Sequence, residues 1–212
     1  MSFKENREPR ERILDAAIML FAKKGFAAAG VREIAALAEV NIAMISYYFE
    51  GKVGILRAII EEFFAHYCRL LSDIDDESKG TDECVRIMIQ RIIDYVRKNT
   101  ELTMVVYNEL PLDIHEIAEM KAEKITELIR SMSGLIRRFG LDPDNTFQIS
   151  MIGPSLFSMI FTNFRLRPLL RDVFKVKFDD IYYERMTETL STLFLNGIHA
   201  VSTQKRRQGE RR

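Results

Sequence analysis

The residue types that most often catalyse reactions or bind metals are few in this chain and stand far apart. His66, His115 and His199 lie on three separate predicted helices, and none has a second ligand at the spacing of a zinc site. Glu62 and His66 are the nearest approach to a Glu-x-x-His pair, but their spacing is not that of a di-iron bundle. The sequence also has no glycine-rich phosphate loop and no G-x-S-x-G elbow. We therefore expect neither an enzyme nor a bound metal or cofactor.

A second group of side chains suits the recognition of DNA. Residues 42–49 are predicted to form a short helix whose inward stripe, at i, i+3 and i+4, is Ile45, Tyr48 and Phe49. That stripe leaves the opposite face free to meet base edges. The candidates for DNA contact on and before this face are Asn41, Ile42, Ala43, Met44, Ser46 and Tyr47. Asn41 and Ser46 can hydrogen-bond to bases or phosphates, whereas the three apolar residues 42–44 can touch thymine methyls or simply allow close approach.

A preceding helix and a turn must position that face. Ile34, Leu37 and Ala38 fall at i, i+3 and i+4, which predicts about two turns of helix over residues 31–38. Residues 39–41 break the pattern, and Asn41 is a strong N-cap for the next helix, which Gly51 then interrupts. Two short helices around a three- to four-residue turn form a helix-turn-helix, whose second helix can lie in a DNA major groove.

Residues 10–60 contain a set of particular residue types in a particular order and spacing. They are Gly25-Phe26, Ile34-Ala35, Ala38-x-Val40, Ile45, Tyr47-Tyr48-Phe49, Lys52 and Leu56. In order and spacing this stretch resembles the N-terminal signature of the tetracycline-repressor (TetR) family of bacterial transcription regulators. The resemblance implies that Lys52 binds a DNA phosphate, that Tyr47 contacts the backbone, and that Tyr48, a further candidate for DNA contact, lies nearer the core. Arg32, in the first turn of the earlier helix, can reach a phosphate across the groove.

Four positions depart from the pattern of that family. Gly30 stands where Ser or Thr usually caps the first helix of the motif, and Gly is an acceptable N-cap. Glu39 replaces the usual turn glycine, and a left-handed conformation there would cost about 1–2 kcal/mol. Ile42-Ala43 replaces a common basic or small polar pair, and Ser46 replaces a common tyrosine. These changes bear on which bases are read and how strongly, more than on the docking mode.

Charge and composition restrict the class of protein. The 212 residues carry 31 basic and 31 acidic side chains, and residues 1–52 hold eight basic against seven acidic, a net charge of +1. Non-specific DNA affinity should therefore be modest and sensitive to salt. The N-terminus is polar and no apolar run approaches the roughly 20 residues that span a bilayer, so we expect a cytoplasmic protein without a membrane partner. Cys68 and Cys84 lack a CxxC or a histidine partner, which favours reduced, buried thiols.

The remaining chain predicts helices without strands. Apolar periodicity indicates helices over residues 52–72, 83–99, 101–110, 114–139, 143–161 and 181–201, with an acidic loop at 73–82 and an irregular connection at 165–178. With the first helix, from residue 9 to Gly25, the prediction is an all-α fold of about nine helices. We expect a DNA-binding domain over residues 1–52, a helical ligand-binding and dimerisation domain over 53–203, and a disordered basic tail over 204–212.

The second half offers side chains that suit a cavity. Aromatic residues and methionines with adaptable packing recur on its helices, although core packing explains most of them equally well. The candidates for a ligand pocket are Phe63, Tyr67, Met88, Tyr95, Met104, Tyr107, Met120, Phe157 and Phe161. The family resemblance implies a small-molecule pocket among these helices and a homodimer formed by the last two long helices. The apolar runs 149–164 and 190–198 suit that interface.

Together these features predict a ligand-responsive, dimeric, DNA-binding transcription regulator of the repressor type. Its partners would be a double-stranded, (pseudo)palindromic operator and a small apolar or amphipathic effector that releases the protein from DNA. The alternative is a helical small-molecule-binding protein whose DNA binding is weakened or lost, and it is suggested by the near-neutral N-terminal region and by Ile42-Ala43.

Overall fold

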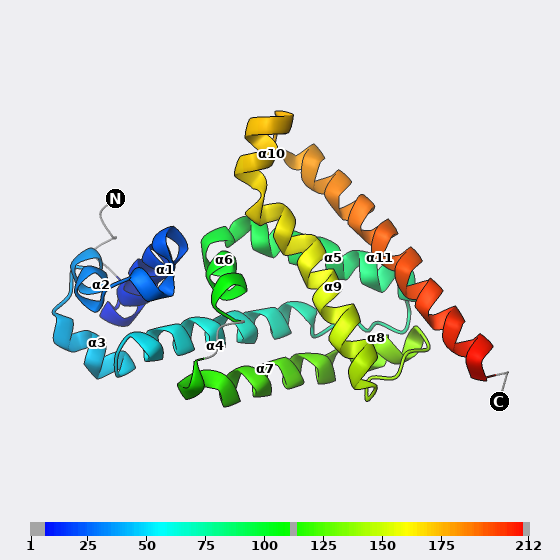
Figure 1. The fold of residues 1–212 in the computed structure, drawn as a ribbon, viewed down its shortest axis with the longest axis horizontal. Helices are drawn as coiled ribbons and strands as arrows, with labels where there is room; N and C mark the ends of the chain where they lie inside the picture. The colour runs from blue at the N-terminus through cyan, green and yellow to red at the C-terminus, as the bar shows by residue number, and fades with distance from the viewer. Residues whose placement is uncertain (1–6, 111–113, 210–212) are drawn as a thin grey trace. The chain divides into compact units, whose positions relative to one another are not determined.

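A computed structural model describes residues 7–110 and 114–209 of the chain. These residues form eleven α-helices and one 3-10 helix, and none of them lies in a strand (Figure 1). The all-α prediction is confirmed, with more helices than the nine expected. The chain divides into two compact units, one of residues 1–67 and 99–126 and the other of residues 68–98 and 127–212. This division cuts across the predicted boundary at residue 52, which stays a prediction about function.

The first unit holds the helix-turn-helix and its supports. Its helices are α1 (Pro9–Ala28), α2 (Val31–Leu37), α3 (Ile42–Phe49), α4 (Lys52–Leu71) up to residue 67, α6 (Thr100–Glu109), η1 (His115–Ile117) and the start of α7 (Ala118–Ser131). Helix α1 packs against α2, α3 and α6, and α2 packs against α3. The helices join through fully buried side chains: Ile13, Ala16, Ala17, Ile34, Ile45, Ile55, Leu56 and Ile60.

The second unit is a separate helical bundle. It contains the end of α4, α5 (Thr81–Lys98), the end of α7, α8 (Ser133–Arg138), α9 (Thr146–Arg165), α10 (Arg167–Phe174) and α11 (Asp180–Gly209). Helix α5 packs against α8, α9 and α11, and α9 also contacts α10 and α11. Val85, Ile89 and Ile93 of α5 are fully buried, which shows that α5 is the central helix of this bundle.

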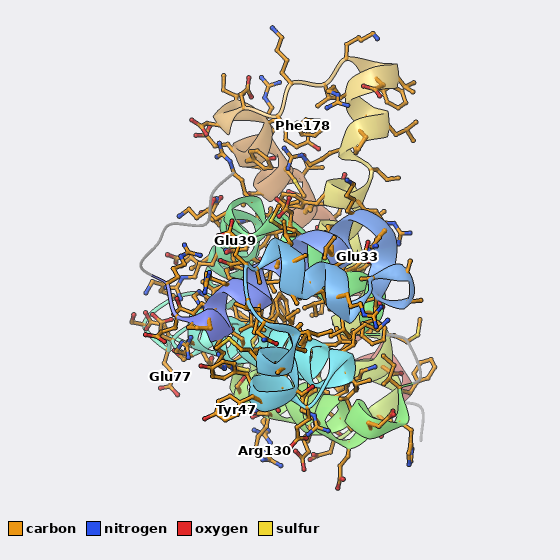
Figure 2. The ribbon with its side chains drawn as sticks, turned by 90° about the vertical axis from the view of Figure 1, so that its left-hand side faces the viewer. Glu33, Glu39, Tyr47, Glu77, Arg130 and Phe178 are labelled. Atoms are coloured by element: carbon orange, nitrogen blue, oxygen red, sulfur yellow. The ribbon has the colours of Figure 1, made fainter. Side chains whose placement is uncertain are left out.

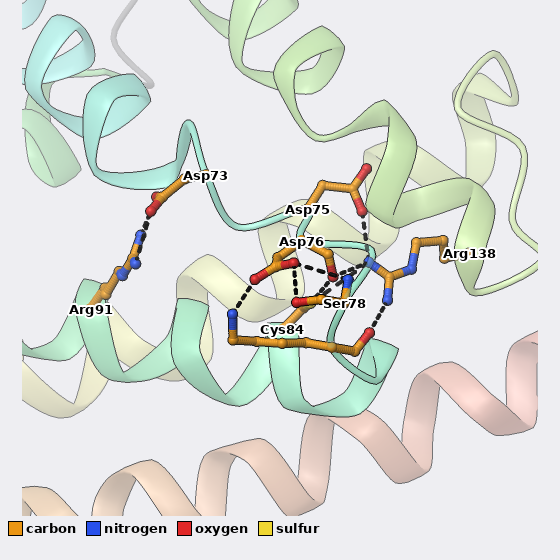
Figure 3. Close-up of polar contacts among 8 residues, drawn as sticks. Asp73, Asp75, Asp76, Ser78, Cys84, Arg91 and Arg138 are labelled. Carbon is orange, nitrogen blue, oxygen red and sulfur yellow. Dashed lines mark hydrogen bonds and ion pairs between the residues drawn. The ribbon is translucent and has the colours of Figure 1, made fainter.

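Two arginines hold the acidic loop between α4 and α5, as Figure 3 shows. Arg91 pairs with Asp73 through Nη2 at 3.2 Å and donates to the Leu70 carbonyl at 3.1 Å. Arg138 of α8 donates to a carboxylate oxygen of Asp75 at 2.9 Å and to the carbonyl of Asp76 at 3.2 Å. The carboxylates of Asp73 and Asp75 are therefore bound by arginines of the same unit. No group of three or more metal-ligating side chains occurs in the described part of the chain.

The long helix predicted over residues 114–139 is interrupted at Met132. Its backbone has φ −95° and ψ −1°, and its N–H is shared between the carbonyls of Leu128 and Ile129 at 3.2 Å each. Gly134 lies so close to Asp75 that an added Cβ would be 1.8 Å from a carboxylate oxygen. A break before Gly134 thus accompanies the close approach between α8 and the α4–α5 loop.

Two further predictions near the C-terminus differ from the structure. The connection expected over residues 165–178 contains helix α10, which begins with Arg167 and Pro168, positions where a proline is compatible with a helix. Helix α11 continues to Gly209, whereas the sequence predicted an end near residue 201 and a disordered tail over 204–212. No proline or glycine interrupts residues 202–208, and Gln, Lys and Arg are good helix formers. Residues 210–212 lie outside the described residues. No described helix meets the length and hydropathy needed to cross a membrane.

Candidate nucleic-acid interface

The turn between α2 and α3 has the geometry of a helix-turn-helix. Glu39 adopts the left-handed conformation, with φ 54°, at the position where the sequence departs from glycine. Its carbonyl accepts a hydrogen bond from Arg12 Nη1 at 3.3 Å, and the N–H of Val40 bonds to the Ala35 carbonyl at 3.0 Å. These contacts compensate in part for the strain of about 1–2 kcal/mol that a left-handed glutamate carries.

Helix α3 begins and ends where the sequence predicts. The side-chain oxygen of Asn41 accepts a hydrogen bond from the Ala43 N–H at 2.9 Å, which confirms the N-cap. At the other end Glu50 and Gly51 both have positive φ, 59° and 122°, so the chain turns sharply into α4. Ile45 and Phe49 are buried, and the guanidinium of Arg10 lies 5.4 Å from the Phe49 ring centre. One face of α3 is thus fixed to α1 and α2.

The other face of α3 is open to solvent, as predicted. Tyr47 is 81% exposed and Figure 2 shows its side chain at the outside of the ribbon. Tyr48 is half-buried and packs edge-to-face on Tyr47, with ring centres 4.9 Å apart. The remaining predicted contacts are exposed, apart from the half-buried Met44: Asn41, Ile42, Ala43 and Ser46. The structure therefore brings these residues together on one surface, and their contacts with DNA stay a prediction.

Lys52, the predicted phosphate ligand, makes intramolecular contacts. Its ammonium donates to the carbonyls of Phe26, Ala27 and Ala29 at 2.9, 3.2 and 3.1 Å. It also lies 4.5 Å from the centre of the Phe26 ring, a cation–π contact. The chain reaches this position because Gly25, with φ 81° and ψ 159°, breaks the helical path of α1. Lys52 thus ties the start of α4 to the end of α1.

Arg32 of α2 and Lys23 of α1 are basic side chains that make no polar contact within the described residues. Both are exposed. Their neighbour Lys24 is paired with Glu33 at 2.6 Å. The hydrogen bond from Lys24, followed by that from the Gly30 N–H, lowers the pKa of the Glu33 carboxyl. Arg32 therefore retains the freedom to reach a phosphate that its sequence position predicts.

Glu109 of α6 is a residue that the sequence did not single out. Its side chain is only 5% exposed, and Oε1 accepts a hydrogen bond from the Phe26 N–H at 3.1 Å. Oε2 has no hydrogen-bond partner. Since Lys52 binds the carbonyl of the same Phe26, helices α6 and α4 are both tied to the end of α1. No sequence pattern around Glu109 indicates that its side chain contacts the backbone of Phe26, which is distant in the chain.

The nine candidate pocket residues fall in both units. Phe63, Tyr67, Met104, Tyr107 and Met120 belong to the first unit, and Met88, Tyr95, Phe157 and Phe161 to the second. Within α4 the rings of Phe63 and Tyr67 stack at 5.5 Å, and within α9 those of Phe157 and Phe161 stack at 3.8 Å. The four half-buried members are Met104, Tyr107, Met120 and Phe157. The pocket stays a prediction.

Comparison with known proteins agrees with this geometry. Residues 13–59 match the family model of bacterial regulatory proteins, tetR family. A curated relative from Bacillus subtilis (strain 168), "Probable HTH-type transcriptional regulator YttP", is 38% identical over 130 residues, which are 57% of this chain and 62% of the relative. The chain thus spans about three fifths of the length of the curated relatives that it matches first.

Solved structures resemble nearly the whole chain. The transcriptional regulator FadR from Bacillus subtilis, in complex with stearoyl-CoA, aligns with a TM-score of 0.68 and 19% identity over 89% of this chain and 99% of that one. AibR in complex with isovaleryl coenzyme A and operator DNA aligns with a TM-score of 0.69 and 16% identity over 88% and 97%. At these identities the likeness shows the fold. Residues 13–59 are thus similar to the N-terminal domain of bacterial regulatory proteins of the tetR family, and the chain has the same fold as the solved transcriptional regulator FadR.

Proposed function

We propose that this chain is a dimeric transcription repressor, acting in the cytoplasm, that leaves its operator when it binds an amphipathic effector. The observation that carries the proposal is the open face of α3, which is capped by Asn41 and ended by Glu50 and Gly51, with Tyr47 projecting from it. A short helix held in this way by two others has the form in which a recognition helix enters the major groove.

Dimerisation is supported by exposed apolar side chains of α9 and α11. Phe147 and Met151 of α9 are 76% and 56% exposed, and Leu193 of α11 is 58% exposed. Large apolar side chains at such exposure are typical of a face that another molecule covers. Within the predicted interface runs, Ile160, Phe161 and Phe194 instead face the core of the second unit. Two copies would supply the two recognition helices needed for a palindromic operator.

The effector we propose is an acyl thioester of coenzyme A or a ligand with similar amphipathic character. Two proteins with this fold were solved with stearoyl-CoA and with isovaleryl coenzyme A. An acyl chain needs apolar and adaptable walls, and the candidate residues of the first unit that could offer them are Phe63, Tyr67, Met104, Tyr107 and Met120. Of these, Met104, Tyr107 and Met120 are half-buried.

The proposed switch acts through α4 and α6. Lys52 and Glu109 hold the carbonyl and the N–H of Phe26, so a displacement of either helix acts on the end of α1. Helix α1 in turn packs against α2 and α3. An effector that prefers the displaced arrangement would change the spacing of the two recognition helices, and DNA affinity falls because both half-sites are no longer met together.

The test starts from a selection of bound sequences from random duplexes with the full-length protein. We expect a palindromic site whose half-sites are centred roughly 34–36 Å apart, bound by two copies. Acyl-CoA thioesters of increasing chain length are then added to the complex, and operator affinity is measured at constant salt. Recovery of no sequence above the random pool would refute the DNA-binding role, and an unchanged affinity at saturating thioester would refute the effector class.

A helical small-molecule-binding protein with weakened DNA binding is the second candidate. It is favoured by one observation, that the ammonium of Lys52 is bound to three carbonyls while α3 carries no charged side chain. This candidate predicts thioester binding without operator binding. Substitution of Tyr47 by alanine would then leave any residual DNA affinity unchanged.

A further inference from the structure

The exposed face of α3 has no charged or amide side chain, and its hydrogen-bonding side chains are hydroxyls that follow the first turn. The helix reads IAMISYYF and contains no Arg, Lys, His, Asn, Gln, Asp or Glu. Ile42, at its first position, is 45% exposed, and Ala43 beside it is also exposed. The part of a recognition helix that meets base edges is its N-terminal turn. Here that turn presents aliphatic side chains.

The one amide nearby is already engaged. An asparagine usually reads adenine with its side-chain oxygen and nitrogen together, which pair with N6 and N7. In this structure the Asn41 oxygen accepts the Ala43 N–H at 2.9 Å as the N-cap of α3. The guanine edge is most often read by a bidentate Arg or Lys, and α3 has neither. Hydrogen-bonded readout by the first turn of α3 is therefore limited.

The major groove offers one apolar feature, the C5-methyl group of thymine. We infer that α3 reads each half-site through thymine methyls, with Ile42 as the residue that determines the specificity and Ala43 allowing the close approach. This inference rests on the proposed operator binding and adds the chemistry of the partner: at the base pair facing Ile42 the protein recognises a methyl group. A thymine without its methyl is then a poor substitute, and a methylated cytosine is a better one than cytosine.

The experiment removes single methyl groups from the operator selected with the full-length protein. Each thymine of one half-site is replaced in turn by deoxyuridine, which keeps the base pair, and the dissociation constant is measured by fluorescence anisotropy at fixed salt. We expect about a fourfold loss at one or two positions, the size of one buried methyl group. At the same position 5-methylcytosine should bind more tightly than cytosine.

Two variants separate the role of Ile42 from general effects on the DNA. Ile42→Ala should bind thymine and deoxyuridine at the sensitive position with nearly equal affinity, because the contacting side chain has been shortened. Ile125→Ala, which shortens an isoleucine of α7 with 40% exposure, should keep the fourfold difference. A double-mutant cycle between the methyl group and Ile42 then gives the coupling directly.

The outcomes distinguish this inference from the function on which it rests. If the operator is bound specifically and no deoxyuridine weakens it, or if the weakening persists in Ile42→Ala, methyl reading by Ile42 is wrong and the repressor proposal stands. If the selection recovers no sequence, the DNA-binding proposal fails, and the inference fails with it.

Discussion

Replacement of Lys52 by alanine should destabilise the protein, because this ammonium joins α4 to the end of α1. It donates to three carbonyls at 2.9–3.2 Å and contacts the Phe26 ring. A single hydrogen bond to a charged group contributes about 1.5–3 kcal/mol, and the three bonds share one ammonium and are partly open to water. We therefore expect a loss of about 2 kcal/mol in the free energy of unfolding for Lys52→Ala. For a chain of this length that corresponds to a fall in Tm of roughly 4–8 °C.

The assay is thermal unfolding followed by circular dichroism, with Lys23→Ala as the matched control. Lys23 is an exposed lysine of α1 without a hydrogen bond or ion pair among the described residues, so its removal should change Tm little. Operator binding at several salt concentrations gives a second readout. A phosphate-binding lysine contributes about 0.9 to the slope of log affinity against log salt. We expect the slope of Lys52→Ala to equal that of the wild type.

The opposite pattern would refute this reasoning. If Lys52→Ala unfolds at the wild-type temperature and its salt slope falls by about 0.9, then Lys52 binds a phosphate and its carbonyl contacts contribute little. The two readouts separate the intramolecular role from the role that the family resemblance implies.

Three further substitutions test other contacts. Glu109→Ala leaves a partly buried N–H unpaired and should cost about 1–3 kcal/mol in urea unfolding, whereas Asn108→Ala, on an exposed neighbour, should cost little; equal losses would contradict the contact. Arg32→Gln should weaken operator binding about equally for all sequences and lower the salt slope by about 0.9, and an unchanged slope would exclude a phosphate contact. The hydrogen bond from Lys79 lowers the pKa of the Asp76 carboxyl below its ordinary value of 3.8. The ionised Asp76 carboxylate therefore stabilises the folded protein above about that pH, and this stabilisation is lost as the pH falls further. Wild-type protein should therefore lose more stability on acidification below about pH 4 than Asp76→Asn, as measured by urea unfolding across that range, and parallel losses would contradict this.

The helix-turn-helix could be predicted closely because its signals are local. Asn41 provides the cap of α3, Gly51 its end, and the spacing of Ile45 and Phe49 its buried face, and all of these act within a few residues. The left-handed turn at Glu39 follows from its place in the family pattern. The open face of α3 follows once its buried face is known.

The features that the sequence did not predict depend on distant partners. The break at Met132 accompanies an approach between Gly134 and Asp75, which are 59 residues apart in the chain, and helical periodicity contains no trace of it. The contacts of Lys52 depend on the path of the chain after Gly25, and that of Glu109 on the packing of α6 against α1. Contacts of this kind, between residues distant in the sequence, are determined by tertiary packing.

The two left-handed glutamates at the ends of α3 have a consequence for how the protein would search a chromosome. Glu39 and Glu50 are exposed acidic residues beside the helix that we propose to meet DNA, and there they would repel phosphates wherever the protein lands. Weak attachment to unrelated sequence shortens each unproductive encounter, so that a larger share of the copies in a cell is free to find the operator. Glycines at these two positions would relax the backbone and would also remove that repulsion.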